Sequence, residues 1–568
     1  MVENGARIHH RNPKGTRAMH RTVTLASQVF FFLAVVVCAT AAAATPVTLQ
    51  WSDVWDGPFQ SDDQADEVAF DGDDRLYVAG RTYEPGLEGN DQDLFLRRYS
   101  ADGVLEWAVV YPGVEREQPT DLFVAANGDV LIVGQTAGSS GVFAFVRRID
   151  PTGGLVWERF LGPHAFAALE NFHPQGEEGP SGAIAVSLST GEDFRVDLLD
   201  PSGATIWSRV HDGPFGGGDR ASDVAIAADG SVYVTGQSWN PAVFEQAAVT
   251  VKYDALGNPV WEDVDGGLIG TFFGYGGVEI AADGNVVVAA NPESSCGSFA
   301  GRVWKLDATT GARLWTDSYP DAPCGVLEPT ELVTAPDGDS VLVGFGSVLV
   351  PRTRMITIRH DADGTRSFVR GHDAPDGPVH RARAVTIDTD GGAIVAGDGD
   401  APDGTPGQVL VKYGPDGDVV WDQRWSPPSG GNGRALDVAV SPGGGVAVVG
   451  YAFDPATRQD ATVVVSQQGS LTSSPSPGGE AVDLSCTPNI FRASTRVRFA
   501  FSRTAPARLD VFDVRGRLLR TLFRGDVAEH AVTWDGRDMR GRLLGSGIYF
   551  LRLSSPDGVA SIRVGKLR

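Results

Sequence analysis

A strand headed by an aromatic residue recurs eight times between residues 51 and 421, at intervals of 50–56 residues. A period near 50 residues, with several short strands in each unit, is typical of a β-propeller. The sequence therefore predicts an all-β fold built around an eight-bladed β-propeller. Seven blades plus an insertion is the alternative, because the repeat is weakest over 181–200. The strand heads are Trp51, Trp107, Trp157, Trp207, Trp261, Trp315, Phe368 and Trp421.

One repeat, over 223–267, shows how each blade is expected to form. Asp229 and Gly230 predict a two-residue hairpin turn, in which glycine supplies the positive φ. The second strand is apolar on both faces, so it is expected to lie between two neighbouring sheets. Four strands are predicted in this repeat, over 224–227, 232–236, 248–253 and 259–264.

The turn before the aromatic strand has its own pattern, as at Asp254, Gly257 and Trp261. Asp can accept hydrogen bonds from the amides of the turn, and Gly can adopt a left-handed conformation. Trp is then expected to cover the adjacent blade. The last repeat lacks a fourth strand, and the segment near 48–55 has no partners before it. We therefore expect this first strand to complete the last blade.

Composition divides the chain into four parts: a signal peptide over 1–44, the propeller over 45–469, a Ser/Pro/Gly linker over 470–479, and a small C-terminal domain over 480–568. Basic residues precede an apolar stretch that ends in alanines, which predicts secretory export, with a membrane anchor as the alternative. No other stretch is apolar enough to span a membrane after cleavage. The propeller segment carries a net charge near −36, which argues against nucleic acid as a partner.

The repeats resemble those of bacterial secreted β-propeller repeat proteins, best over 223–261 and 66–107 and more weakly over 181–200 and 354–368. The run at 307–315 is similar to the tryptophan-docking motif of quinoprotein dehydrogenases. Both resemblances imply a fold, and a fold does not carry a function. Quinoprotein chemistry would need vicinal cysteines, which this chain lacks, so no cofactor is expected.

The C-terminal segment resembles the flagellar-hook-capping-type immunoglobulin-like domain and the related type A sorting domain of type IX secretion cargo. The resemblance rests on Asn489-Ile490-Phe491, LDVFDVRGRLLRTL (509–522), Trp534-Asp535-Gly536 and SGIYFLRL (546–553). It implies a small immunoglobulin-like β-sandwich. As a sorting domain it would bring the secretion machinery in as a partner and direct the protein outside the cell or onto its surface. As a structural module it would end an exported protein.

Motifs of hydrolases and nucleotide enzymes are absent: the chain has no H-E-x-x-H, C-x-x-C, G-x-S-x-G or P-loop sequence. We assign no catalytic residue and no metal site. His360, His372 and His380 lie closest together among the histidines. Their spacing fits no metal template, and they are expected to be exposed loop residues.

Acidic residues open five of the predicted first strands, which line the axis of a propeller. Together they could ring the mouth of the channel and hold a cation or a basic ligand. The alternative is that each acid caps the entry of its own strand. These candidate ligand-binding residues are Glu67, Asp121, Asp223, Glu331 and Asp437.

Two cysteines, Cys296 and Cys324, lie in loops that emerge on the same face of a propeller. Export permits disulfides, and we expect these two to form one.

These observations favour an exported binding or scaffold module, whose partner would be an extracellular protein or a glycan. A secreted hydrolase or lyase that uses Asp223 and Asp437 at the channel mouth is the alternative.

Overall fold

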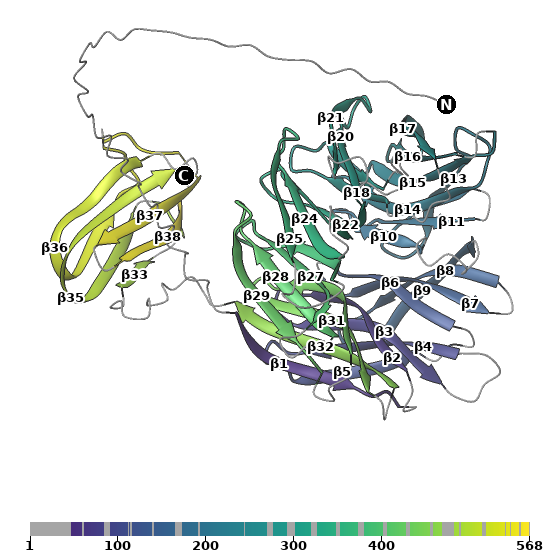
Figure 1. The fold of residues 1–568 in the computed structure, drawn as a ribbon, viewed down its shortest axis with the longest axis horizontal. Helices are drawn as coiled ribbons and strands as arrows, with labels where there is room; N and C mark the ends of the chain where they lie inside the picture. Colours follow the sequence, from purple (N-terminus) through teal and green to yellow (C-terminus); the bar gives the residue numbers. More distant parts are fainter. Residues whose placement is uncertain are drawn as a thin grey trace, which may run out of the picture. The chain divides into compact units, whose positions relative to one another are not determined.

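The computed structural model describes residues 47–566 apart from short stretches between strands, the longest of which are 292–300 and 469–481. The predicted signal peptide and the whole of the predicted linker lie outside the described residues. Within the described part of the propeller segment, the strands form eight four-stranded antiparallel sheets (Figure 1). This all-β arrangement of repeated sheets is that of a β-propeller.

The first four sheets are made from sixteen consecutive strands. Their strands are β2 (Asp63–Phe70), β3 (Leu76–Glu84), β4 (Asp91–Tyr99) and β5 (Leu105–Tyr111); β6 (Arg116–Val124), β7 (Val130–Gly138), β8 (Gly141–Ile149) and β9 (Leu155–His164); β10 (Gln175–Glu178), β11 (Ile184–Ser189), β12 (Phe194–Leu199) and β13 (Thr205–His211); β14 (Asp219–Ile226), β15 (Val232–Asn240), β16 (Glu245–Tyr253) and β17 (Pro259–Ile269). The weak repeat over 181–200 thus lies in a complete four-stranded sheet.

The other four sheets use the remaining strands of the segment together with the first strand of the chain. Their strands are β18 (Gly276–Ile280), β19 (Val286–Ala290), β20 (Gly301–Leu306) and β21 (Arg313–Tyr319); β22 (Val326–Thr334), β23 (Ser340–Ser347), β24 (Arg354–His360) and β25 (Arg366–His372); β26 (Arg381–Ile387), β27 (Ala393–Asp400), β28 (Pro406–Tyr413) and β29 (Val419–Trp425); β30 (Gly433–Val440), β31 (Gly445–Asp454), β32 (Arg458–Gln468) and β1 (Val47–Trp55).

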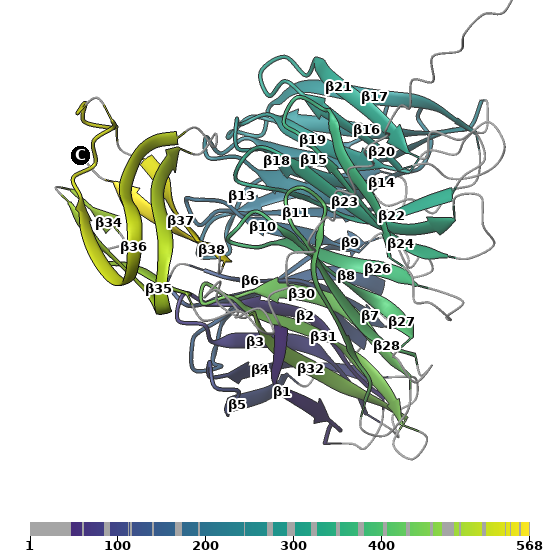
Figure 2. The same cartoon turned by 60° about the vertical axis from the view of Figure 1, so that its left-hand side comes forward.

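The expected closure is present, because β1 pairs antiparallel with β32 along its length. Figures 1 and 2 show the purple strand β1 beside the green strands β31 and β32. Its sheet packs in turn on the sheet of β2–β5, where Ala65 and Val78 share a buried cluster with Ala447 and Val463. The two ends of the repeat array therefore hold each other in place.

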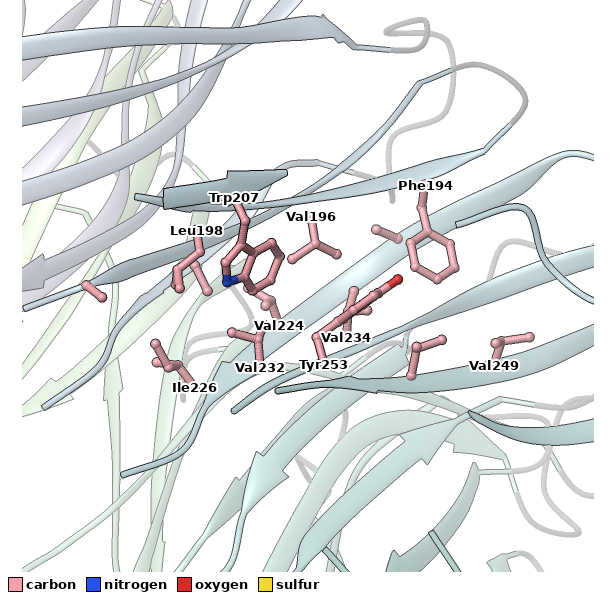
Figure 3. Close-up of a cluster of buried hydrophobic side chains, with 14 residues drawn as sticks. Phe194, Val196, Leu198, Trp207, Val224, Ile226, Val232, Val234, Val249 and Tyr253 are labelled. Atoms are coloured by element: carbon pink, nitrogen blue, oxygen red, sulfur yellow. The ribbon is translucent and has the colours of Figure 1, made fainter. Parts of the chain in front are cut away.

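Buried clusters join every sheet to the next. The second strand β15 shows how: Val232 and Val234 face the sheet of β10–β13, whereas Tyr233 faces the sheet of β18–β21. Alternate side chains of a strand point to opposite faces, so a strand between two sheets needs apolar residues at every position. Figure 3 shows one such cluster, with Trp207 packed over Val224 and Val232.

The hairpin between the first two strands differs from the two-residue turn that the sequence predicted. In the turn after β14, Gly230 N–H donates to Ala227 O (2.9 Å), and Ala227 N–H donates to Ser231 O (2.8 Å). Only Gly230 has a positive φ, of 81°, whereas a two-residue type I′ turn needs two such residues. The loop is therefore a three-residue type I turn followed by a glycine bulge.

The turn before each aromatic strand matches the prediction. At Asp254, the carboxylate accepts the Leu256 N–H (2.9 Å) and the Asn258 N–H (2.8 Å). Gly257 has a φ of 78° and lies against the ring of Trp207, on the preceding sheet. The indole N–H of Trp207 donates to Ala255 O (3.1 Å) in the same turn. Seven of the eight aromatic strand heads, from Trp51 to Phe368, thus dock on the glycine turn of the following sheet. The indole N–H of the eighth, Trp421, donates instead to Gln468 Oε1 at the end of β32 (3.4 Å).

The C-terminal segment forms six strands around one core, in the order β33-β35-β37-β38-β34 with β36 paired to β35. Two of these strands are long and span Thr495–Asp513 and Leu518–Trp534. Trp534 is buried at the centre with Phe499 and Leu551. The strands are β33 (Val482–Thr487), β34 (Ile490–Phe491), β35 (Thr495–Asp513), β36 (Leu518–Trp534), β37 (Gly547–Ser555) and β38 (Gly558–Lys566).

Candidate functional site at the inner strands

The five predicted acids occupy one structural position. Each lies on the first strand of its sheet, directly after a bulge, and pairs with the same position of the second strand, as Asp223 does with Thr235. The same register holds for Glu67 in β2, Asp121 in β6, Glu331 in β22 and Asp437 in β30. The repeat therefore brings these acids to equivalent places on successive inner strands.

Four of these carboxylates accept a backbone N–H from the first strand of the next sheet. Val68 N–H donates to Asp437 Oδ2 (2.9 Å), and Val278 N–H donates to Asp223 Oδ2 (2.9 Å). The same bond joins Gly176 to Asp121 (3.3 Å) and Val385 to Glu331. A hydrogen bond from a backbone N–H to a carboxylate is a strong one, so these acids clamp neighbouring sheets together.

The strand-capping alternative holds for three of the acids as well. Asp121, Asp223 and Asp437 each use Oδ1 to accept the N–H of the following residue, at 2.9, 2.8 and 2.6 Å. Each of these side chains therefore caps its own strand with one oxygen and reaches the next sheet with the other. The capping that the sequence offered as one alternative is thus present in these three acids. The hydrogen bond to the next sheet was not predicted.

The sequence analysis did not predict two further acids of the same region. Glu177 in β10 and Glu279 in β18 lie two residues further along their strands than the predicted position. The Glu177 carboxylate accepts the Ile226 N–H of the next sheet (2.7 Å). Residues two apart in a strand share a face, so a search that allowed this spacing would have found both.

Burial raises the pKa of all seven carboxyl groups, and repulsion from neighbouring acids adds to the shift of most of them. The pKa of Asp437 rises to about 6, and those of Asp121, Asp223 and Glu177 rise to about 7. The pKa values of Glu67, Glu279 and Glu331 lie well above the usual range for glutamate. All seven acids are partly exposed, so protein surrounds them but they keep some contact with solvent.

Among the neighbouring acids, Asp437 raises the pKa of Glu67 most, and it also raises that of Glu331. Asp121 and Glu331 also act on Glu67. Burial and repulsion between like charges both favour the protonated form of a carboxyl group, so they favour retention of protons on these acids toward neutral pH. The inner strands thus present both proton donors and carboxylates, which suit a cation or a basic group.

The histidines were predicted to be exposed loop residues. This prediction is wrong for His360 and His380. His360 is in β24 and is 1% exposed, and His380 is 2% exposed. His360 Nε2 lies 2.7 Å from Asp317 Oδ2, and His360 stacks on Trp315. Because β24 is a third strand between two sheets, its side chains are buried. Cys296 and Cys324 lie outside the described residues.

Comparison with known proteins gives partial matches. A family model described as the outer membrane protein assembly factor BamB matches residues 192–361, under a third of the chain. No curated protein matches the sequence. No helix in the described part of the chain is long and apolar enough to cross a membrane.

Several solved structures are similar over much of their length. PorZ, a surface component of the type-IX secretion system of Porphyromonas gingivalis, is 12% identical, with 89% of this chain and 86% of that chain covered and a TM-score of 0.31. The β-propeller domain of the Trilobed protease from Pyrococcus furiosus is 9% identical over 64% and 95%, with a TM-score of 0.38. Drosophila Semaphorin 1b is 9% identical over 76% and 89%, with a TM-score of 0.39. Similarities of this size identify no ligand and no reaction.

Proposed function

We propose that the chain is an exported, eight-bladed β-propeller that acts as a binding or scaffold module, followed by a small immunoglobulin-like β-sandwich. The observation that carries the proposal is that the acids of the inner strands accept hydrogen bonds from the backbone of the next sheet. Asp121, Asp223 and Asp437 spend both carboxylate oxygens on backbone N–H groups. Such groups hold a scaffold in shape, whereas a catalytic acid needs a carboxyl group that is free to meet a substrate.

The partner in this proposal is an extracellular protein or a glycan. A library of glycan, peptide and ester substrates tests it against catalysis. We expect no turnover by the full-length protein, and saturable binding on arrays of glycans or extracellular proteins. Turnover that increases in proportion to protein concentration, and that is lost with a variant of the inner-strand acids, would contradict the proposal.

The C-terminal domain is proposed to serve secretion or surface attachment through the secretion machinery. Support comes from the resemblance of the motifs within 489–553 to sorting-type domains. Trp534 of the matching Trp534-Asp535-Gly536 segment is fully buried, and its indole N–H donates to Arg537 O (3.2 Å). Fractionation of cells that make the native protein, with intact mass measurement, tests this role. A product that starts near residue 45, lacks about 480–568 and lies outside the cell would identify a cleaved sorting domain. A periplasmic product that retains the domain would make it a structural module.

The loop cysteines complete the proposal. We expect Cys296 and Cys324 to form a disulfide in the exported protein. Peptide mapping without reduction tests this pairing. Recovery of both cysteines as free thiols would contradict it.

One observation favours the second candidate, a hydrolase or lyase. The pKa values of Asp121 and Asp223 lie at about 7, where a general acid works best near neutral pH. If this function is correct, the double variant Asp223→Asn/Asp437→Asn abolishes an activity while far-UV circular dichroism stays unchanged. Its prediction fails if the wild-type protein turns over no substrate.

A further inference from the structure

The outermost strand of a sheet has one edge that no strand of the described chain covers. This holds for β9, β13 and β17, each of which ends its sheet and pairs with a single other strand. Backbone N–H and C=O groups along such an edge can pair with a strand from another molecule. Natural proteins often protect an open edge with charged side chains. The side chains on these three strands therefore decide whether the edge is protected.

Two positions of the outer strand face the preceding sheet, namely the residue before the aromatic strand head and the third residue after it. In β17 the strand head is Trp261, and these positions are Val260 and Val264. Glu262, between them, lies 4.0 Å from His211 of β13 (Oε1 to Nε2). Side chains two residues apart in a strand share a face. Both valines therefore lie on the side of β17 that faces β13.

Three successive sheets carry apolar side chains at both positions, and each of these side chains keeps between 37% and 59% of its surface exposed. Apolar side chains gathered at a surface mark interaction sites, whereas single ones are common everywhere. We call the six side chains the rim band. They are Val156 and Phe160 in β9, Ile206 and Val210 in β13, and Val260 and Val264 in β17.

The other repeats show that the fold does not need apolar residues at these positions. The residue before the strand head is Glu106 in β5 and Ser367 in β25. The third residue after it is Ser318 in β21, Gly371 in β25 and Arg424 in β29. Each of these strands is likewise the outer strand of a complete four-stranded sheet. The apolar residues of the rim band therefore point to a role outside the fold.

The surroundings of the rim band are negatively charged. Asp150, Asp200 and Asp254 stand in the turns before β9, β13 and β17. Hydrogen bonds from side chains and backbone amides of the same turns lower the pKa of each of them, so these carboxylates are ionised at neutral pH. The propeller segment as a whole carries a net charge near −36. Two copies of this chain would repel each other, so the charge favours a basic partner.

We propose that the open edges of β9, β13 and β17 bind an extended segment of another exported protein, with apolar residues at every second position and Lys or Arg at its ends. This inference rests on the proposed binding function and names the kind of partner. The segment adds a strand to the sheet, so backbone hydrogen bonds hold it and its alternate side chains pack beside the rim band. Its basic ends are attracted by the turn aspartates.

Fluorescence anisotropy with the full-length protein and a labelled peptide tests this proposal. The probe has the sequence K-K-V-T-V-T-V-T-K-K, and we expect it to bind saturably. The triple variant Phe160→Ser/Val210→Ser/Val264→Ser should bind the probe at least about tenfold more weakly, because it removes apolar contact on all three strands. If circular dichroism shows that the triple variant is unfolded, Val210→Ser takes its place and should weaken binding by about threefold.

The matched control alters apolar side chains outside the rim band that are similarly exposed. Leu49→Ser/Val104→Ser/Val419→Ser changes three such residues, and this variant should bind the probe as the wild type does. A second peptide, with Ser in place of each Val, keeps the charge of the probe and should bind at least about tenfold more weakly. Equal binding of the two peptides would mean that charge alone attracts them, and it would overturn the proposal.

Other results would also overturn it. One is a wild-type protein that does not bind the probe at millimolar concentration, and another is a folded triple variant that binds it as the wild type does. A wild-type dimer in sedimentation velocity that is lost in the triple variant would identify a second copy of the chain as the occupant. Array binding of extracellular proteins or glycans that persists in the triple variant would contradict this inference but leave the proposed function standing.

Discussion

Neighbouring sheets are joined in two ways, at their outer strands and at their inner strands. At the outer strands, an indole such as that of Trp207 packs on a glycine turn of the next sheet. At the inner strands, carboxylates such as that of Asp223 accept a backbone N–H of the next sheet. The outer contact combines ring packing with an indole hydrogen bond and contains no titratable group, whereas the inner one depends on protonation. The same junction thus combines a constant contact with a titratable one.

Replacement of the outer contact should have the largest effect. Trp207→Ala removes a side chain that is 6% exposed and part of a 14-residue cluster. Loss of a buried Trp costs about 3–5 kcal/mol, and chemical denaturation measures it. Val210→Ala, on the same strand but 59% exposed, is the control and should cost little. If both variants lose the same small amount, the indole does not hold the sheets together.

The glycine partner offers a sharper test of the same contact. A Cβ on Gly257 would lie 2.7 Å from the Trp207 ring at a φ of 78°. Gly284 has a φ of 81° but nothing near its Cβ position. Gly284→Ala should therefore cost only the left-handed conformation, about 1–2 kcal/mol. Gly257→Ala should cost about 1–3 kcal/mol more, because overpacking adds to the strain. Equal losses in denaturation would show that the indole can move aside.

The inner contact predicts a dependence on pH. The folded pKa of Asp223 is about 7, above its unfolded value near 4, so the folded protein binds more protons between these values. The contribution of this group to the free energy of unfolding should therefore be highest below about pH 4, should fall between about pH 4 and 7, and should stay constant above that.

A single variant isolates this smaller effect. Asp223→Asn removes one titrating group, and the fall between about pH 4 and 7 should become shallower by up to about 1.4 kcal/mol per pH unit. The slope matters rather than the offset, because Asn also loses one acceptor oxygen. Trp207→Ala should leave the slope unchanged. An identical slope in wild type and Asp223→Asn would show that the inner acids stay ionised in the folded protein.

Sequence patterns predicted the parts of the fold that depend on neighbouring residues. The docking turn at Asp254 and Gly257 follows from hydrogen bonds within five residues. The pairing of β1 with β32 followed from counting strands. The hairpin at Gly230 was assigned the wrong turn type, because Asp-Gly is compatible with both turns and only the φ values distinguish them.

Sequence patterns predicted the inner acids less completely. The five predicted positions share one register, but Glu177 and Glu279 stand two residues away from it. The sequence also failed to predict that His360 and His380 are buried. Histidine is a polar residue, and without a clear apolar pattern around it we expected it at the surface. For His360 the deciding neighbour, Asp317, belongs to another sheet.

The sequence by itself determined the repeat, the four strands of each sheet and the turn that docks seven of the eight aromatic strand heads, since all of these depend on residues close together in the chain. Only the tertiary structure decided which carboxyl groups favour a bound proton and which sheets they join. Asp437 reaches Val68 from the other end of the array. Burial and repulsion among such groups arise only when the sheets pack, because they depend on distances across sheets and not along the chain.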